Sequence, residues 1–387
     1  MQLLLLLIVA GAGESRAETT DPFRFSLLTC GAHEEVYSLY GHSAIRFENL
    51  ETGEDLVVNY GVFDFHKPYF VLRFVFGLTD YQMGITTFEN FLREYQYYHS
   101  SVTQQELDLT ASEKAAILYA LQQNALPQNI VYRYNYFYDN CTTRARDMLT
   151  QHLDGTVHYP AVTDSTLTYR EMVHQCTEGH PWLQTGIDLL LGVGADRPTS
   201  GAEQQFLPAH LMHDFSSAEV WRSDGSRRQL VLRTTPLLES GPQARSKEFP
   251  LSPEATFGLF FVLTVAITVM EIFRRRVMYL YDLLLMLLTG VAGIIIFAML
   301  FSQHPTVRVN LHLLMLNPLP LFFLYPVIRR ERAHRFHWWW HLQLALLILY
   351  LIGGFFQAYP VGMYFWALSL LVRNVTRYRV LQRHARR

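Results

Sequence analysis

The sequence contains few cysteines and carries almost no net charge. Only three of its 387 residues are cysteines, and no two are neighbours in the chain, so none is placed to resolve a mixed disulfide and thiol redox exchange is disfavoured. The net charge is −2, and the first 250 residues hold no basic stretch interleaved with aromatics, which argues against a nucleic-acid partner. No motif for a cofactor or a metal and no internal repeat is present. We therefore expect a protein that needs neither a cofactor nor a metal.

The chain is long enough for two domains, and its hydrophobic residues divide it accordingly. Before about residue 250, apolar and charged residues alternate as in a soluble domain. Beyond it, apolar runs reach about twenty residues, the length that crosses a hydrocarbon core. The predicted order is a signal peptide (1–17), a soluble domain (18–235), a linker rich in proline, serine and charge (236–253), a transmembrane domain (254–375) and a basic tail (376–387).

The first seventeen residues, MQLLLLLIVAGAGESRA, have a short apolar core and end with small residues at Ser15 and Ala17. This pattern indicates a secretory signal cleaved near Ala17, although no positive charge precedes the core; a short uncleaved anchor is the alternative. In both cases the domain that follows is exported. Outside the cytoplasm Cys30 and Cys176 can form a disulfide, which would leave Cys141 as a free thiol.

Five apolar segments follow the linker, at 257–273, 280–301, 311–328, 342–356 and 360–372. Arginines cluster after the first, third and fifth segments, whereas the loop between the second and third holds only Arg308. Because basic loops remain in the cytoplasm, this pattern places the C-terminus there and the soluble domain on the opposite side of the membrane. The signal peptide predicts the same orientation.

The soluble half has the pattern of an α+β domain. We predict strands at FRFSLLTC (23–30), SAIRF (43–47) and LVVNYGVF (56–63), with the last two joined as a hairpin. Helices are predicted at 109–123, where Thr110 and Glu113 have the spacing of a capping box, and around 170–175 and 204–212.

The stretch YFYDNCTTRARDML (136–149) places Cys141 where an aromatic-rich segment becomes a helix. Asp139 or Asn140 is suited to cap that helix, so Cys141 falls in its first turn. The helix dipole there, together with Arg144 one turn on, stabilises a thiolate, which is the nucleophilic form of cysteine. The alternative is a buried cysteine without a chemical role.

His42, in YGHSAIRF, provides the partner that such a cysteine needs. An imidazole can take the proton of the thiol and later return one to a leaving group, which is the minimal set for nucleophilic acyl transfer. Asn59 on the neighbouring strand is the candidate that orients the ring, with Asp64 in reserve. The alternative is a structural histidine in a strand.

Polar residues also lie at the outward boundary of the second and third apolar segments, in SQHPTVRVNLHLLMLNPLPL (302–321). Polar groups at this depth are costly, so the segment, which also holds His312 and Asn317, suggests a site for a lipid headgroup or another substrate, with His304, Arg308 and Asn310 as the candidate binding residues. Interfacial snorkelling and helix capping are the alternative explanations.

The motifs YGHSAIRF, NYGVFDF and NYFYDNCTTRARD resemble those of the Lnb N-terminal periplasmic domain family, which includes a lipoprotein N-acyltransferase of Gram-negative bacteria. The resemblance covers Phe23 to Thr150, and the hydrophobic half is similar in layout only. The soluble part is also similar to the permuted NlpC-type, papain-like folds that include lecithin:retinol acyltransferase. In those folds the histidine lies in a strand and the cysteine follows an asparagine at a helix start, roles that fall on His42 and Cys141. A second histidine that often follows the first has no counterpart here, which leaves Asn59 as a hypothesis.

The resemblance implies that Cys141 takes an acyl chain from a membrane phospholipid as a thioester. The α-amino group of the N-terminal cysteine of a diacylated lipoprotein then accepts the chain, with Arg144, His304, Arg308 and Asn310 as candidate substrate contacts. Both substrates are anchored in the outer leaflet of the inner membrane, where a tethered domain meets them at high effective concentration. A cysteine hydrolase that acts on phospholipid or peptidoglycan, and a non-catalytic membrane scaffold, are the alternatives.

Overall fold

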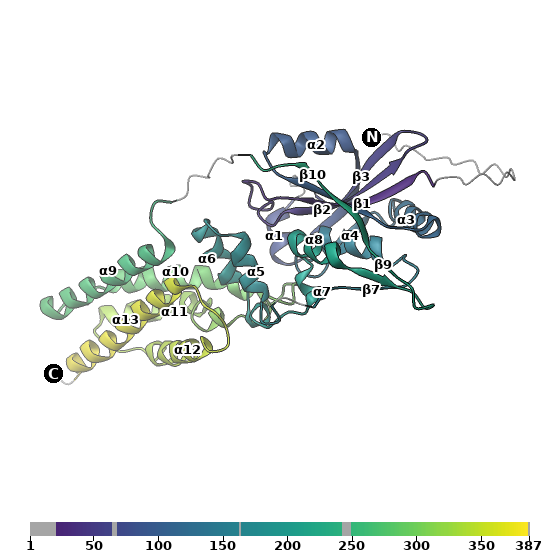
Figure 1. Ribbon diagram of the computed structural model, residues 1–387. Helices are drawn as coiled ribbons and strands as arrows, with labels where there is room; N and C mark the ends of the chain where they lie inside the picture. The colour runs from purple at the N-terminus through teal and green to yellow at the C-terminus, as the bar shows by residue number, and fades with distance from the viewer. Residues whose placement is uncertain (1–20, 64–67, 162–163, 242–248, 386–387) are drawn as a thin grey trace, which may run out of the picture.

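The computed structural model describes residues 21–63, 68–161, 164–241 and 249–385. The predicted signal peptide lies outside these residues. A sheet-rich N-terminal domain is followed by a helical C-terminal region, and the two parts lie side by side (Figure 1). The mixed α+β architecture predicted from the sequence is therefore confirmed.

A seven-stranded antiparallel sheet forms the centre of the N-terminal domain. Its strand order is β10-β5-β1-β2-β3-β4-β6. The strands are β1 (Phe23–Cys30), β2 (His42–Asn49), β3 (Glu54–Val62), β4 (Asp80–Thr87), β5 (Val102–Leu107), β6 (Val131–Arg133) and β10 (Val231–Leu238). The predicted hairpin is formed by β2 and β3, and β10 extends three residues into the predicted linker. A smaller sheet contains β7 (Thr156–His158), β8 (Glu219–Trp221) and β9 (Arg227–Gln229).

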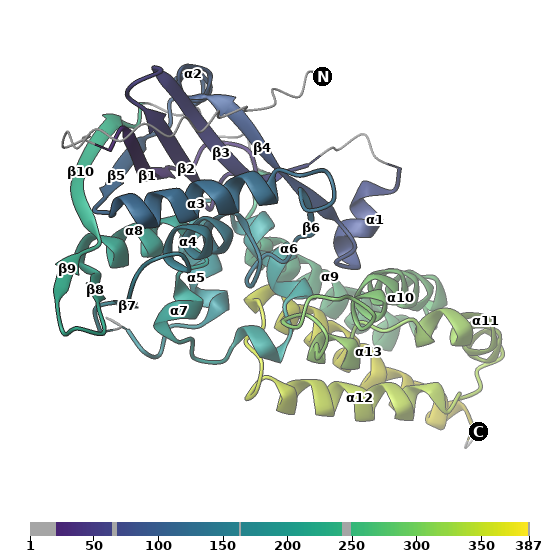
Figure 2. The same cartoon turned by 90° about the vertical axis from the view of Figure 1, so that its right-hand side faces the viewer.

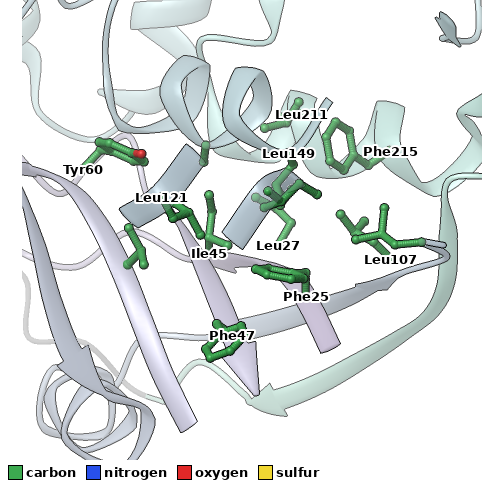
Figure 3. Packing of buried hydrophobic residues seen from close by; sticks show 14 of the residues in the cluster. Phe25, Leu27, Ile45, Phe47, Tyr60, Leu107, Leu121, Leu149, Leu211 and Phe215 are labelled. Carbon is green, nitrogen blue, oxygen red and sulfur yellow. The ribbon is translucent and has the colours of Figure 1, made fainter. Parts of the chain in front are cut away.

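Helices cover both faces of the large sheet, so its central strands are buried on both sides. Helices α3 (Ala111–Asn124), α4 (Cys141–Thr150) and α8 (Pro208–Ser217) pack on one face against Phe25, Leu27 and Ile45 (Figure 3). Helix α2 (Phe88–Tyr97) packs on the other face, over Leu28 and Cys30. This arrangement carries the start of α4 to the end of the sheet where β2 begins.

Two helix predictions have different outcomes. The capping box at Thr110 and Glu113 is present, and α3 begins where it was expected. The single helix predicted at 204–212 is wrong, because α7 (Gly201–Gln204) ends and α8 begins afresh at Pro208. Proline has no N–H to continue a helix and is favoured at the first helical position, so it separates the two. Helices α5 (Tyr169–Cys176) and α6 (Pro181–Leu190) and the short turn η1 (Val193–Ala195) complete the domain.

The C-terminal region consists of α9 (Pro253–Arg274), α10 (Tyr279–Met299), the short turn η2 (Leu311–Leu314), α11 (Leu319–Arg332), α12 (Trp339–Gly353) and α13 (Val361–Ala385). Three of its segments are long and apolar enough to cross a membrane, at Pro253–Arg274, Tyr279–Met299 and Leu311–Arg332. Helix α12 is a shorter apolar helix, and α13 packs against α9. Helix α13 continues through residue 376, the predicted start of the tail.

A buried ionic cluster joins four of these helices. Arg373 and Arg377 on α13 are almost fully buried. Both belong to the arginines that follow the fifth apolar segment. Arg373 pairs with Asp282 of α10 at 2.8 Å, and Arg377 pairs with Glu271 of α9 at 2.7 Å and with Glu331 of α11 at 3.2 Å. These two arginines therefore bind carboxylates between helices. The prediction that the basic loops face the cytoplasm rests on the remaining arginines.

Substituting Asp282 by alanine is expected to destabilise the helical region strongly. Both Arg373 and Arg377 hydrogen-bond this carboxylate, so its removal leaves three buried guanidinium N–H groups without an acceptor, and removing one partner of a buried ion pair costs about 3–5 kcal/mol. Glu331→Gln is the matched control, because three carboxylates face two arginines and Glu331 pairs with Arg377 alone. Thermal unfolding in detergent should show a much larger loss for D282A than for E331Q. Equal melting temperatures for D282A and the parent protein would contradict this assignment.

Candidate active site

Helix α4 begins at the cysteine because Asn140 caps it. The side-chain oxygen of Asn140 accepts hydrogen bonds from the backbone N–H groups of Thr142 and Thr143, both at 2.9 Å, and the Asn140 N–H donates to the Thr143 hydroxyl at 2.9 Å. This capping box satisfies N–H groups that have no partner within the helix. Asn140, rather than Asp139, is therefore the cap, and Cys141 is the first residue of the helix.

His42 is the first residue of β2, and the glycine before it determines how it enters the sheet. Gly41 has a φ of +73°, and a Cβ atom there would lie 2.6 Å from the carbonyl oxygen of Cys30. Only glycine adopts this conformation and this close approach without strain. The turn therefore delivers His42 opposite Cys30, its partner on β1, at the end of the sheet.

Asn59 holds the His42 ring. The register of the hairpin pairs Ala44 with Asn59, and because side chains alternate along a strand, His42 and Asn59 share a face of neighbouring strands. Nε2 of His42 and Oδ1 of Asn59 are 3.0 Å apart. An amide oxygen only accepts hydrogen bonds, so Nε2 carries a proton and Nδ1 is left to receive one from a thiol. The reserve candidate, Asp64, lies outside the described residues.

Cys141 and His42 form a pair whose charged state is stabilised. Burial alone raises the pKa of the Cys141 thiol, but the His42 charge, a hydrogen bond from His42 and another from the backbone N–H of Ser43 lower it to about 7. Burial acts to lower the pKa of His42. Attraction to the thiolate and hydrogen bonds to Cys141 and Asn59 outweigh the effect of burial, so the pKa of His42 is raised. A large fraction of thiolate is therefore present near neutral pH.

The pair opens into a cavity of about 120 Å³ with a largely aromatic wall. Tyr81 stacks on Tyr134 with ring centroids 4.1 Å apart, and Phe63 stacks on Tyr81 at 4.9 Å. Such a wall offers apolar surface for a hydrocarbon chain and hydroxyl groups for an ester. Other residues that line the cavity are Tyr37, Tyr40, Gly41, Tyr60, Gly61, Tyr136, Asn140, Thr142, Phe206, Leu207 and Pro208.

Two family models match the chain. Residues 16–175 match the Lnb N-terminal periplasmic domain, and residues 244–385 match the Lnb transmembrane domain. The chain belongs to the Lnb family. It is a membrane protein with a periplasmic N-terminal domain and a transmembrane C-terminal region. A search of curated proteins gave no match, and neither did a search of solved structures.

In this Lnb family member, Arg144 lies beside the site without lining the cavity. Its guanidinium binds both carboxylate oxygens of Asp139, at 2.6 and 2.8 Å, and lies 3.5 Å from the ring centroid of Tyr132. A guanidinium held by a bidentate pair and a ring has little freedom to reach a substrate. The structure therefore does not bring Arg144 together with Cys141 and His42 as a substrate-binding residue.

The three other predicted substrate residues lie in the segment between α10 and η2, and none of them lines the cavity. Asn310 is buried, donates to the Leu189 carbonyl at 2.8 Å and accepts from the Gln357 side chain at 3.1 Å, so it connects α6 to the membrane helices. His304 is half-buried near Phe74, with ring centroids 6.3 Å apart. Arg308 is exposed, and its Nε donates to the Ser302 carbonyl at 2.9 Å.

The disulfide considered for Cys30 and Cys176 does not form, because all three cysteines are free. Cys30 is buried beneath α2, and burial raises the pKa of its thiol; burial raises the pKa of Cys176 to about 11. Among the described residues no group of three histidine, cysteine or acidic side chains could hold a metal ion. Cys141 therefore stands apart from the other two thiols in its acidity.

Alkylation of Cys141 by iodoacetamide is expected to reach half its maximal rate near pH 7. The rate rises with pH because only the thiolate reacts. His42→Ala should move this midpoint above pH 9, because burial then raises the thiol pKa without an opposing charge. Peptide mass spectrometry as a function of pH measures this, with Cys30 and Cys176 as internal controls that stay unmodified. A midpoint near 9 in the parent protein would disprove the ion pair.

Proposed function

We propose that the protein is a lipoprotein N-acyltransferase. It moves an acyl chain from a membrane phospholipid, through a thioester on Cys141, to the α-amino group of the N-terminal cysteine of a diacylated lipoprotein. The observation that carries the proposal is the Cys141 thiol at a helix start, paired with His42, which Asn59 orients at 3.0 Å, beside an aromatic cavity. This arrangement suits acyl transfer through a covalent intermediate.

In the first half-reaction the Cys141 thiolate attacks the carbonyl carbon of the phospholipid ester. A carbon–sulfur bond forms, and the negative charge moves to the carbonyl oxygen, which the N–H of Cys141 at the helix start is suited to stabilise. When the tetrahedral intermediate collapses, the ester carbon–oxygen bond breaks. Protonated His42 gives its proton to the leaving oxygen, and a lysophospholipid departs.

In the second half-reaction the neutral α-amino group of the lipoprotein attacks the thioester carbon. An α-amino group has a pKa of about 8, so a useful fraction is neutral near pH 7. His42, now neutral, accepts the proton that the nitrogen loses as the amide bond forms. The carbon–sulfur bond breaks, the Cys141 thiolate returns, and His42 is again protonated beside it.

The contact between the two parts of the protein supports this choice of substrates. Phe206 and Leu207, which line the cavity, belong to one cluster of buried side chains with Met299 at the end of α10 and Val307 in the loop after it. The cavity therefore lies close to the outward end of a membrane helix. We place the protein in the inner membrane with its C-terminus in the cytoplasm, and assign Arg308 and His304 to the headgroup region.

Substitution of each of the three site residues is expected to reduce the rate of acyl transfer, to a different extent for each residue. Cys141→Ala removes the nucleophile and should abolish activity, whereas His42→Ala should slow it about 10²–10⁴-fold because the acid and base are lost. Asn59→Ala should act more weakly, through a misoriented ring. Mass spectrometry of lipoprotein N-termini from complemented cells measures the N-acylated fraction, with Cys176→Ser as the control. Normal N-acylation in cells that carry only C141A would refute the proposal.

A thioester is expected on Cys141 when the protein is incubated with phospholipid vesicles without an acceptor. The adduct should have the mass of one acyl chain, should be released by hydroxylamine, and should be absent in H42A after the same time. Addition of a diacylated lipopeptide should transfer the chain to its amine. If free fatty acid is released instead while the lipopeptide stays unmodified, the enzyme is a hydrolase.

A further inference from the structure

Helix α1 (Phe70–Val75) is held against the end of a membrane helix. The N–H of Gln303, which follows α10, donates to the Phe76 carbonyl at 3.0 Å, and Arg133 of β6 donates to the Gln303 side chain at 3.3 Å. A Cβ atom on Gly77 would lie 3.1 Å from the Cβ of Gln303, so the two backbones approach closely. Figure 2 shows α1 beside β4 and β6, at this edge of the sheet and on the side of α10. These contacts fix α1 beside the end of α10, a helix long and apolar enough to cross a membrane.

Around α1, large apolar side chains are exposed. Tyr69 is 77 % exposed, Leu72 is 55 % exposed and Phe74 is 41 % exposed, and Leu78 after the helix is also exposed. Phe301, two residues before Gln303, is 67 % exposed, so the apolar surface continues onto the end of the membrane helix. A cluster of exposed apolar side chains at the edge of a membrane-spanning region is suited to the boundary between lipid headgroups and acyl chains.

The same segment is continuous with the catalytic cavity. The chain leaves the cavity wall at Phe63, at the end of β3, and returns to it at Tyr81 in β4. These two rings stack on each other, and α1 lies on the connection between them. Arg73 of α1 also pairs with Asp80, the residue before Tyr81, at 3.1 Å, so α1 is held beside the strand that carries this part of the wall.

We propose that Tyr69, Leu72, Phe74 and Leu78 insert among the acyl chains of outer-leaflet phospholipids and form the route by which the donor reaches Cys141. The occupant of this surface is the bilayer itself, because α1 is hydrogen-bonded to the residues that follow a spanning helix. Arg308 lies exposed on the same loop, where its charge is suited to a lipid phosphate group. That the lipid is also the acyl donor rests on the function proposed above.

Photo-crosslinking tests the lipid contact without requiring catalysis. The crosslinking residue p-benzoylphenylalanine is placed at Leu72 or, as the matched control, at Leu232, which is 65 % exposed on β10 at the opposite edge of the sheet. In nanodiscs of phosphatidylethanolamine and phosphatidylglycerol, mass spectrometry should find lipid adducts at position 72 and none at 232. Absence of lipid adducts at position 72, or equal yields at both positions, would overturn the proposal.

A kinetic comparison tests the route to the cavity. Leu72→Asp should slow thioester formation from vesicle phospholipid about tenfold, the loss expected for an apolar contact, whereas Leu232→Asp should not change it. Alkylation of Cys141 by iodoacetamide should stay the same in both variants, which shows that the site is intact. An unchanged rate in L72D would overturn the route. If the parent protein forms no thioester, the proposed acyl transfer fails, and the crosslinks still decide whether α1 contacts lipid.

Discussion

The chemistry proposed for this protein depends on keeping an ionisable thiol inside a folded domain. Burial favours the neutral forms of both Cys141 and His42, so either group alone would be uncharged near neutral pH. Together each stabilises the charge of the other, and the Ser43 N–H and the Thr142 hydroxyl add donors to the sulfur. Asn59 completes the pair because its oxygen at Nε2 fixes which ring nitrogen faces the thiol. The ionisation of the thiol and the orientation of the imidazole ring beside the cavity therefore depend on the same three residues.

Asn140 links this unit to the rest of the fold. Its oxygen caps α4, and its amide nitrogen donates to the carbonyls of Tyr136 and Phe206 at 3.0 and 2.9 Å. One side chain thus positions the cysteine and also holds the chain that carries Leu207 and Pro208 into the cavity wall. Loss of Asn140 would disturb both the helix start and the cavity, because the buried groups that it hydrogen-bonds would have no water to replace it.

The sequence predicted the local parts of the site and not the parts that depend on distant contacts. The helix start at Asn140, the hairpin that brings Asn59 beside His42, and the capping box of α3 depend on residues a few positions apart, which pattern rules describe well. The motifs around His42, Asn59 and Cys141 supply Tyr40, Tyr60 and Tyr136 to the cavity wall, whereas nothing nearby marks Phe206 as part of it. Asn310 was interpreted from its depth alone, because its partner Gln357 lies 47 residues away. Arg377 was grouped with a basic tail because its partners lie on other helices.

Polar contacts also fix the two halves of the protein against each other. Buried Arg170 on α5 binds Asp188 at 2.8 Å and Asp196 at 2.6 Å, and the Gln357 side chain, between α12 and α13, donates to the Leu191 carbonyl at 3.1 Å. Arg170 thus holds α5 to α6 and to the turn that follows it, and the bonds from Gln357 to Leu191 and from Asn310 to Leu189 attach this unit to the membrane region. At the other end of those helices, the ion pairs of Arg373 and Arg377 hold α9, α10, α11 and α13 together. The helices are thus joined into one unit to which the periplasmic domain is attached, and a fixed distance between the cavity and the membrane helices suits the proposed reaction between two anchored substrates.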